Sequence, residues 1–347
     1  MSKYRVGIIG LGRIASTIDD EVHGYPAVLL PYSHTACYRQ VPRVEIVAAA
    51  DVDAAKREAY GERWGIANLY ADYREMLAQE RLDLVSVCTP TGVRAPIVID
   101  CARAGVKAIY AEKPLATSLA EADEMVAVCH ERGVKLAINC SRRWHPFYNR
   151  AQELIAAGEI GSVLNITAYL HCNISHNGSH LMDIVRYFAD DAPVKWVFGE
   201  MADEEKARTD EDLSGNGYLA FANGITAFVR MMACGRTSLE LDILGTEGRI
   251  RCLSNGVAWE LWTAAQRGRW PEMTQRFFPY PQHIEAPGVR AIKDLLHCLE
   301  HGGEPACSGE DGRAVLELAI ALRESHRRGG VKVELPLADR SLRIVSK

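Results

Sequence analysis

The sequence predicts an α/β domain built on a doubly wound parallel sheet, followed by an α+β domain with a large, mainly antiparallel open sheet. In the first third of the chain, apolar strand-like runs alternate with helical segments, as in parallel sheets covered by helices. After about residue 150, strand-like runs with period-two alternation follow one another with few helices between them. The 347 residues also exceed what one core usually supports. We place the domains at residues 1–125 and 126–347.

The first strand is the apolar, β-branched run Tyr4–Ile9, which leads into a glycine-rich turn with the pattern G-x-G-x-x-A. In a dinucleotide-binding turn, Gly10 would permit the tight bend and Gly12 would let the backbone approach a pyrophosphate. Ala15 would keep helix and strand close, and the helix amides would face the phosphates. Glycine-rich turns also occur for conformational reasons alone. The residues assigned to a cofactor here are Gly10, Gly12, Arg13 and Ile14.

The second strand, Val44–Ala50, ends at Asp51, where a carboxylate is expected to accept hydrogen bonds from ribose hydroxyls. The alternative is a helix cap, because a helical stretch follows. An acidic residue here disfavours the 2′-phosphate of NADP and therefore favours NAD. Arg13 and Arg57 could bind that phosphate, so NADP is the alternative cofactor.

Asp51 follows Gly12 at nearly twice the usual spacing of about 20 residues. The surplus lies in residues 16–32, and the amphipathic helix resumes at residues 33–38. An insertion at this point emerges at the carboxyl edge of the sheet, where it either shapes or covers the substrate pocket or forms a plain surface loop.

The remaining elements of the first domain alternate between helix and strand. They are helices at 54–64, 73–79, 95–104 and 119–132, and strands at 82–88, 106–111 and 134–138. A ligand crevice forms at the carboxyl ends of such strands, where Gly10, Asp51, Thr89, Glu112 and Asn139 fall. The second domain is expected to hold strands at 163–172, 194–201, 217–221, 226–233, 238–244 and 248–252 and a helix at 310–328.

Composition is that of an ordinary enzyme. Lys plus Arg number 40 against 45 Asp plus Glu, and the net charge of −5 argues against nucleic acid as a partner. No apolar run reaches membrane-spanning length, and the first residues lack a signal-peptide core. The ten cysteines form no CxxC pair and are expected to be reduced thiols of a cytoplasmic protein.

The run Glu112-Lys113-Pro114 closes a strand at the edge where a nicotinamide would lie. Desolvation and the positive ring would lower the pKa of Lys113, suiting it to exchange a proton with a substrate oxygen. The alternative is a surface lysine paired with Glu112. We expect Glu112 to position the cofactor or Lys113, and Pro114 to fix the turn.

The chain resembles the Gfo/Idh/MocA oxidoreductase family, nearly end to end. The motifs that carry the resemblance are the glycine turn with Asp51, Cys88-Thr89-Pro90, Ala111-Glu112-Lys113-Pro114-Leu115, Arg142-Arg143-Trp144, Gly158-Glu159-Ile160-Gly161, Gly178-Ser179-His180-Leu181-Met182-Asp183 and Ser308-Gly309-Glu310-Asp311-Gly312. The resemblance implies a Rossmann domain that binds NAD(P) and a second domain that faces a sugar, polyol or related hydroxy compound. It also implies homo-oligomers, dimers or tetramers, built largely through the open sheet.

The resemblance implies a second proton-handling group in the later domain. His176, His180 and Asp183 are spaced i, i+4, i+7, which places them on one face of a helix if that stretch is helical. In the family the residue at the His180 position faces the substrate and a carboxylate often stands four residues earlier, where this chain has His176. We assign His180 as acid/base partner or substrate ligand, His176 as a weaker catalytic or substrate candidate, and Asp183 as a substrate-side residue that orients His180 or supports the helix. The alternative is that the histidines cap or pack the helix. With His171 and Cys172 they also resemble zinc ligands, although the family chemistry implies no metal.

Many relatives carry Asn and His where this chain has Thr91 and Arg94. Arg94 is expected either to pair with a substrate carboxylate or phosphate, favouring a uronate or nucleotide-linked sugar, or to lie at a solvent-exposed helix start. We also assign Thr89, Pro90, Glu112, Lys113 and Arg143 to the binding of the cofactor.

The sequence therefore predicts an NAD(P)-dependent oxidoreductase that transfers a hydride between nicotinamide and a secondary alcohol or ketone of a sugar, cyclic polyol or sugar derivative. Lys113 and His180 would handle the proton. The alternatives are a reductase of an imine or enol ether, a redox-neutral enzyme that recycles its bound NAD, and a non-catalytic NAD-binding regulator.

Overall fold

The computed structural model describes residues 3–235, 238–267 and 269–346. The chain divides into two compact units, the residues up to 144 with 285–313 and residues 145–284 with 314–346. The first unit extends beyond the expected boundary at residue 125 because strand β6 (Lys135–Ile138) pairs with β5 (Ala108–Ala111). Helix α10 (Pro287–His301) also belongs to the first unit, because the chain returns to that unit after residues 145–284 of the second unit.

The first unit is built on a six-stranded sheet with the order β3-β2-β1-β4-β5-β6, and every pair in it is parallel. This confirms the predicted doubly wound sheet. Its other strands are β1 (Tyr4–Ile9), β2 (Val44–Ala50), β3 (Leu69–Tyr70) and β4 (Leu84–Val87). The last residues of neighbouring strands stand opposite one another, namely Ala50, Ile9, Val87, Ala111 and Ile138. The residues that follow them therefore share one edge.

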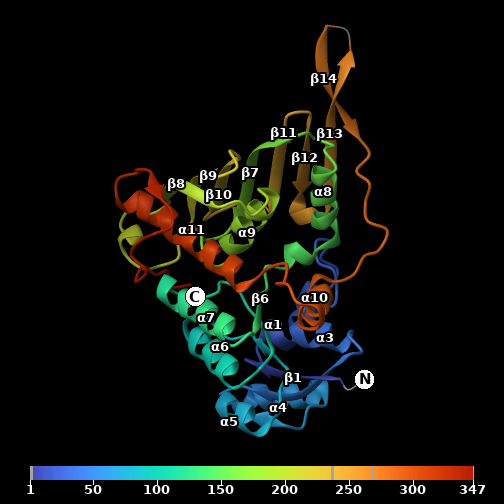
Figure 1. The fold of residues 1–347 in the computed structure, drawn as a ribbon, viewed down its shortest axis with the longest axis vertical. Helices are drawn as coiled ribbons and strands as arrows, with labels where there is room; N and C mark the ends of the chain where they lie inside the picture. The colour runs from blue at the N-terminus through green and yellow to red at the C-terminus, as the bar shows by residue number, and fades with distance from the viewer. Residues whose placement is uncertain (1–2, 236–237, 268, 347) are drawn as a thin grey trace. The chain divides into compact units, whose positions relative to one another are not determined.

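Helices connect these strands (Figure 1). They are α1 (Arg13–Ser16), α2 (Ile18–Val22), α3 (His34–Arg39), α4 (Ala54–Trp64), α5 (Tyr73–Gln79), α6 (Arg94–Arg103) and α7 (Leu119–Glu131), with the 3-10 turns η1 (Thr91–Val93) and η2 (Ser141–Trp144). The helix after β1 is interrupted between α1 and α3, where the sequence carries its surplus. None of the described helices is long and apolar enough to span a bilayer.

The second unit is built on a nine-stranded sheet with the order β14-β13-β12-β11-β7-β10-β9-β8-β15. The strands are β7 (Val163–His171), β8 (Val194–Met201), β9 (Gly215–Phe221), β10 (Thr226–Met232), β11 (Glu240–Gly245), β12 (Gly248–Leu253), β13 (Ala258–Arg267), β14 (Trp270–Arg276) and β15 (Val333–Glu334). Among these described strands only β7 and β10 pair in parallel, so the sheet is mainly antiparallel, as predicted. The hairpin β13–β14 was not predicted.

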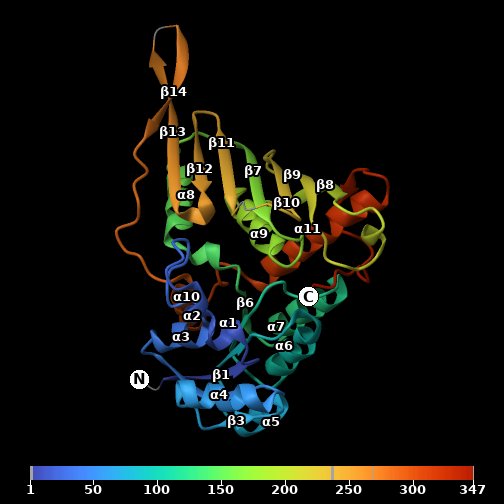
Figure 2. The same ribbon diagram turned by 180° about the vertical axis from the view of Figure 1, so that it is seen from behind.

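One face of this sheet carries the helices α8 (Pro146–Ala156), α9 (Gly178–Phe188) and most of α11 (Gly309–Arg327), as Figures 1 and 2 show from opposite sides. Strand β8 illustrates the division, because its buried side chains alternate with exposed ones. At Gly199 the helix α11 passes so close that a Cβ would lie 2.1 Å from the Leu322 carbonyl oxygen. The other face carries partly exposed side chains such as Phe198, which is 40% exposed.

Candidate active site

The turn after β1 contains two glycines that are required for different reasons. Gly10 has φ +85°, and a Cβ there would come within 3.0 Å of the backbone of Cys88 and Thr89. Gly12 has an ordinary φ of −78°, and a Cβ there would meet nothing within 4 Å. The fold therefore demands Gly10, whereas the space in front of Gly12 is open, as the approach of a pyrophosphate requires.

Asp51 joins this turn to the end of β2. Its Oδ2 accepts a hydrogen bond from the Leu11 amide at 2.7 Å, and its Oδ1 accepts one from the Asp53 amide at 2.9 Å. The cap of α4 is Asp53, whose side chain accepts from the Ala55 amide. A carboxylate has about four acceptor sites, so Asp51 keeps acceptors for ribose hydroxyls.

Arg13 and Arg57, the two arginines that could bind the 2′-phosphate of NADP, both form hydrogen bonds with other residues of the protein. Arg13 donates to the Glu21 carboxylate of α2, with Nε 2.8 Å from Oε1. Arg57 donates to the Asp51 carbonyl oxygen at 2.7 Å. Neither arrangement leaves a ready-made pair of arginines for a 2′-phosphate.

A cavity of about 640 Å³ lies beside Gly12, between the β1–α1 turn and α4. Its lining carries the charged side chains of Arg13, Lys56, Glu62 and Arg63, and the two arginines form ion pairs with Glu21 and Asp20. At the end of β4, the Thr89 hydroxyl oxygen is buried and has no hydrogen-bond partner among the described residues. The open cradle and this unpaired hydroxyl fit a dinucleotide lying along the edge. Pro90, also assigned to the cofactor, is exposed and precedes η1.

Glu112, directly after β5, is held by a buried network that the sequence analysis did not predict. Its Oε1 lies 3.0 Å from Nε2 of His34 and accepts a hydrogen bond from Asn139 at 2.6 Å. The Asn139 amide is itself oriented by the Tyr110 hydroxyl at 2.6 Å, and Nδ1 of His34 lies 2.6 Å from the Ser86 hydroxyl. His34 reaches the site from α3, on the far side of the insertion.

The charges in this network stabilise each other. Burial opposes ionisation of Glu112, but hydrogen bonds and charge from His34 hold the pKa of the carboxyl at about 2. Burial alone would lower the pKa of His34, but Cys88 and Glu112 together raise it above its ordinary value. Both oxygens of Glu112 are therefore engaged, because Oε2 accepts a hydrogen bond from the Lys113 amide at 3.2 Å.

Lys113 follows on the same edge. Burial lowers the pKa of its ammonium group, Glu112 opposes this effect, and Arg94 and Arg142 add to it. The direction is the one expected from the sequence, although it arises here from the protein alone. A lowered pKa makes a lysine better suited to serve as a general base or acid. The Lys113–Pro114 peptide bond is cis.

Arg94 does not lie at an exposed helix start, because only 2% of it is exposed. Its guanidinium donates to the carbonyl oxygens of Pro114 and Thr89, so it ties the Lys113 turn to the end of β4. Thr91, next to it in η1, is also buried. The guanidinium nitrogen Nε is buried without a partner among the described residues.

Two other segments of the first unit complete this edge. Arg143 in η2 is 3% exposed, and it donates to the Ala306 carbonyl oxygen at 3.2 Å and lies 3.5 Å from the Asp311 carboxylate. Burial raises the pKa of Tyr32, at the end of the insertion, and the charge of Arg142 opposes that rise. The insertion therefore ends beside η2, whereas residues 23–26 are mostly exposed.

In the second unit, helix α9 begins at Gly178, so His176 lies in the turn before it and only His180 and Asp183 are helical. Their spacing suggested one helical face, but the three residues do not share one, because His176 precedes the helix. Asp183 is fully buried. The amides of Ser175 and His176 donate hydrogen bonds to the carboxylate of Asp212, at 2.8 and 2.7 Å. Asp212 is a residue that the sequence analysis did not single out.

A glycine turn with an open cradle, a carboxylate after the second strand and a held lysine on the same edge define a nicotinamide-dependent oxidoreductase. The chain belongs to the Gfo/Idh/MocA oxidoreductase family. Residues 4–140 match the family's NAD-binding Rossmann fold, and residues 152–335 match its C-terminal α/β domain. The predicted family, fold class and cofactor are thereby confirmed.

Named relatives cover most of the chain. The chain is 30% identical over 324 residues to D-apiose dehydrogenase of Paraburkholderia graminis, and the match covers 86% of this chain and 85% of the relative. It is 25% identical to myo-inositol 2-dehydrogenase of Thermotoga maritima, covering 95% and 98%. Levoglucosan dehydrogenase, solved with NADH and levoglucosan, has the same fold, with a TM-score of 0.80 at 20% identity over 97% of this chain and 100% of that one.

Proposed function

We propose that the protein is an NAD-dependent dehydrogenase that oxidises a secondary hydroxyl group of a sugar or cyclic polyol. The observation that carries the proposal is Lys113, whose pKa burial lowers, on the same sheet edge as the open cradle at Gly12. Relatives named for apiose and myo-inositol support the class of substrate. Asp51 and the engaged Arg57 support NAD over NADP.

In the proposed reaction, Lys113 in its neutral form accepts the hydroxyl proton, and in the reverse direction it returns that proton to the carbonyl oxygen. Bound nicotinamide supplies the hydride acceptor. Glu112 holds Lys113 through its backbone amide and through charge. From the second unit, His180 serves as the second hydrogen-bonding or proton-handling group, with His176 and Asp183 as supporting residues.

Gly10, Gly12, Asp51 and Thr89 would hold the cofactor, together with the amides at Arg13 and Ile14. The engagement of Arg94 with two backbone carbonyl oxygens supports a neutral sugar or polyol over a uronate or nucleotide-linked sugar. We assign Arg94 to holding the Lys113 turn, and Arg143 to holding η2 at the same edge.

The proposal extends to the setting of the enzyme. All ten cysteines are free thiols, and eight of them are buried, which supports a reducing compartment such as the cytoplasm. The partly exposed aromatic side chains on the open face of the nine-stranded sheet support a homo-oligomer formed through that face.

The first test is a screen for NADH formation with sugars, polyols and uronates, using the wild type, Lys113→Met and Lys107→Met. Lys107 precedes the same strand at its other end and pairs with Asp83, so its variant removes an equal charge away from the site. We expect Lys113→Met to lower kcat by about 10²- to 10⁴-fold and Lys107→Met to retain turnover.

Undiminished turnover by Lys113→Met would contradict the role of the lysine. A wild type that binds NADH but turns over none of these compounds would contradict the dehydrogenase and favour the regulator or self-recycling alternatives.

A further inference from the structure

The turn that precedes α9 is held by one carboxylate. Asp212, in the loop between β8 and β9, accepts hydrogen bonds from the amides of Ser175 and His176, one on each oxygen. Next to it, the Ile174 amide donates to the Leu213 carbonyl oxygen at 2.7 Å. The loop and the turn are therefore joined over three consecutive residues.

This turn begins the helix that carries His180. The Ser179 amide donates to the Ser175 carbonyl oxygen at 3.0 Å, and the Ser179 hydroxyl donates to the His176 carbonyl oxygen at 2.7 Å. The His180 amide follows with a bond to the Asn177 carbonyl oxygen at 3.1 Å. The positions of Ser175 and His176 thus determine the first turn of α9.

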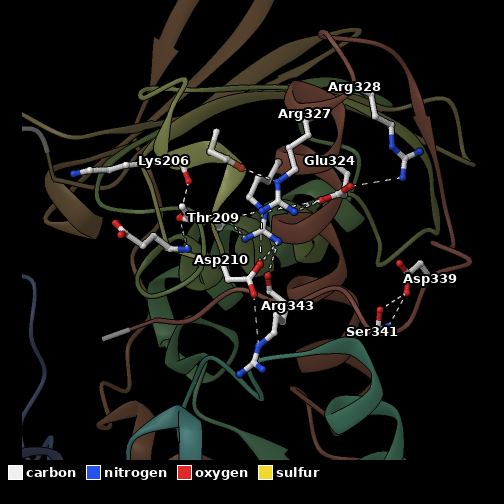
Figure 3. Close-up of polar contacts among 12 residues, drawn as sticks. Lys206, Thr209, Asp210, Glu324, Arg327, Arg328, Asp339, Ser341 and Arg343 are labelled. Atoms are coloured by element: carbon white, nitrogen blue, oxygen red, sulfur yellow. Dashed lines mark hydrogen bonds and ion pairs between the residues drawn. The ribbon is translucent and has the colours of Figure 1, made fainter.

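The loop that carries Asp212 is itself anchored on its other side (Figure 3). The Asp210 carboxylate lies 3.6 Å from Arg327 and 3.8 Å from Arg323, both on α11, and 4.0 Å from Arg343. Arg323 is fully buried and donates to the Thr209 carbonyl oxygen at 3.3 Å. The loop is fixed to α11, a helix that packs on the sheet, and is not left to move alone.

The segment after β15 adds a third attachment. The Val345 amide donates to the Asp210 carbonyl oxygen at 2.7 Å, and the Ser346 hydroxyl donates to Oδ2 of Asp212 at 3.2 Å. Burial raises the pKa of Asp212, while the two amides, Ser346 and the charge of Arg323 oppose that rise. A residue that must accept on both oxygens here is best served by an ionised carboxylate.

We propose that Asp212 is a positioning residue of the active site, which sets the first turn of α9, and with it the place of His180, through the amides of Ser175 and His176. The contacts of Asp210 with α11 and of Val345 and Ser346 with the loop hold Asp212 in turn. The inference rests on the proposed function, because it assigns His180 to the reaction.

The test compares Asp212→Asn with Glu211→Gln. The carboxamide introduced by Asp212→Asn would present one accepting oxygen and one donating nitrogen, so either Ser175 or His176 would lose its partner. Glu211 is exposed and adjacent, so its variant removes the same charge and spares the turn. We expect Asp212→Asn to speed hydrogen exchange at residues 174–180 by about tenfold or more and to lower kcat/KM by about 10- to 100-fold.

NADH affinity, measured by fluorescence titration, should stay unchanged in both variants, because the cofactor is assigned to the other unit. Unchanged exchange in Asp212→Asn would overturn the clamp, and faster exchange with unchanged kcat/KM would overturn its link to the reaction. If Asp212→Asn fails to fold, Ser346→Ala should show the same two effects at smaller size, and their absence would also overturn the proposal. A wild type without turnover would defeat the proposed function, and hydrogen exchange would still decide whether Asp212 holds the turn.

Discussion

At Lys113, two effects on the ammonium group act in opposite directions. Burial favours the neutral amine, while the ionised Glu112 favours the ammonium form. The neutral amine is the proposed base, so kcat/KM for oxidation should rise with pH through the pKa of Lys113. Replacing Glu112 by Gln removes the stabilising negative charge, which lowers that pKa further.

We therefore expect Glu112→Gln to move the acid limb of the kcat/KM profile to lower pH by about one unit or more. The measurement is a pH series of initial rates at saturating NAD. Glu124→Gln, on the exposed face of α7, provides a control that should leave the profile in place. A limb that moves to higher pH, or does not move, would contradict the assignment of that limb to Lys113.

Some of the residues that the sequence analysis assigned to the site follow a strand end, Gly10 and Asp51 directly and Lys113 after one further residue. Gly10, Asp51 and Lys113 are predictable because register places the ends of parallel strands side by side. His34 carries a weaker signal: a histidine on the buried face of α3 must find a partner. Its partner Glu112 depends on how α3 packs after an insertion, which no local pattern specifies.

At the level of elements, the two glycines of the β1–α1 turn are expected to have different roles, Gly10 in folding and Gly12 in cofactor binding. Gly10→Ala would place an L-residue at φ +85° against the backbone of Cys88, and we expect it to cost about 1–3 kcal/mol of stability. Gly12→Ala has an allowed φ and open space, so its stability should stay within about 1 kcal/mol of the wild type.

Gly12→Ala should nevertheless weaken NADH binding by about tenfold or more, because the added Cβ occupies the approach to the pyrophosphate. Denaturant unfolding and fluorescence titration measure the two quantities separately. Normal NADH affinity in a stable Gly12→Ala variant would show that the dinucleotide does not pass over this turn.

Elements differ in how far local sequence specifies them. The strands β1, β2, β4 and β5 are short, largely buried runs, and their apolar composition suffices to predict them. Strand β14 is exposed along almost its whole length, so it has no alternation to reveal it. The spacing of His176 and His180 is helical, but the tertiary bonds from Asp212 hold His176 in a separate turn before α9, which no local pattern specifies.

For the whole molecule, the order of the chain does not follow the division into units. Residues 285–313 return to the first unit, where Asp294 on α10 accepts a hydrogen bond from the Trp144 indole at 2.9 Å. A boundary drawn from the change in sequence pattern cannot detect such a return, because α10 has the same amphipathic character as any helix that covers a sheet.

The open face of the nine-stranded sheet determines the last prediction. Trp196 and Phe198 on β8 and Tyr218 on β9 form a partly exposed aromatic cluster, with ring centroids 5.3 and 5.5 Å from that of Trp196. Aromatic side chains of this kind carry much of the binding energy in protein interfaces. We expect the protein to be a dimer or tetramer by light scattering at micromolar concentration.

Phe198→Asp should weaken this assembly by about tenfold or more, because it would place a charge in the centre of an apolar contact. Val257→Asp provides the control: Val257 is also exposed, at 44%, but belongs to the loop between β12 and β13. If Phe198→Asp keeps the wild-type mass on dilution while Val257→Asp dissociates, the interface lies elsewhere. A monomeric wild type with full turnover would show that the aromatic face is not needed to complete the site, and that each chain carries the whole reaction by itself.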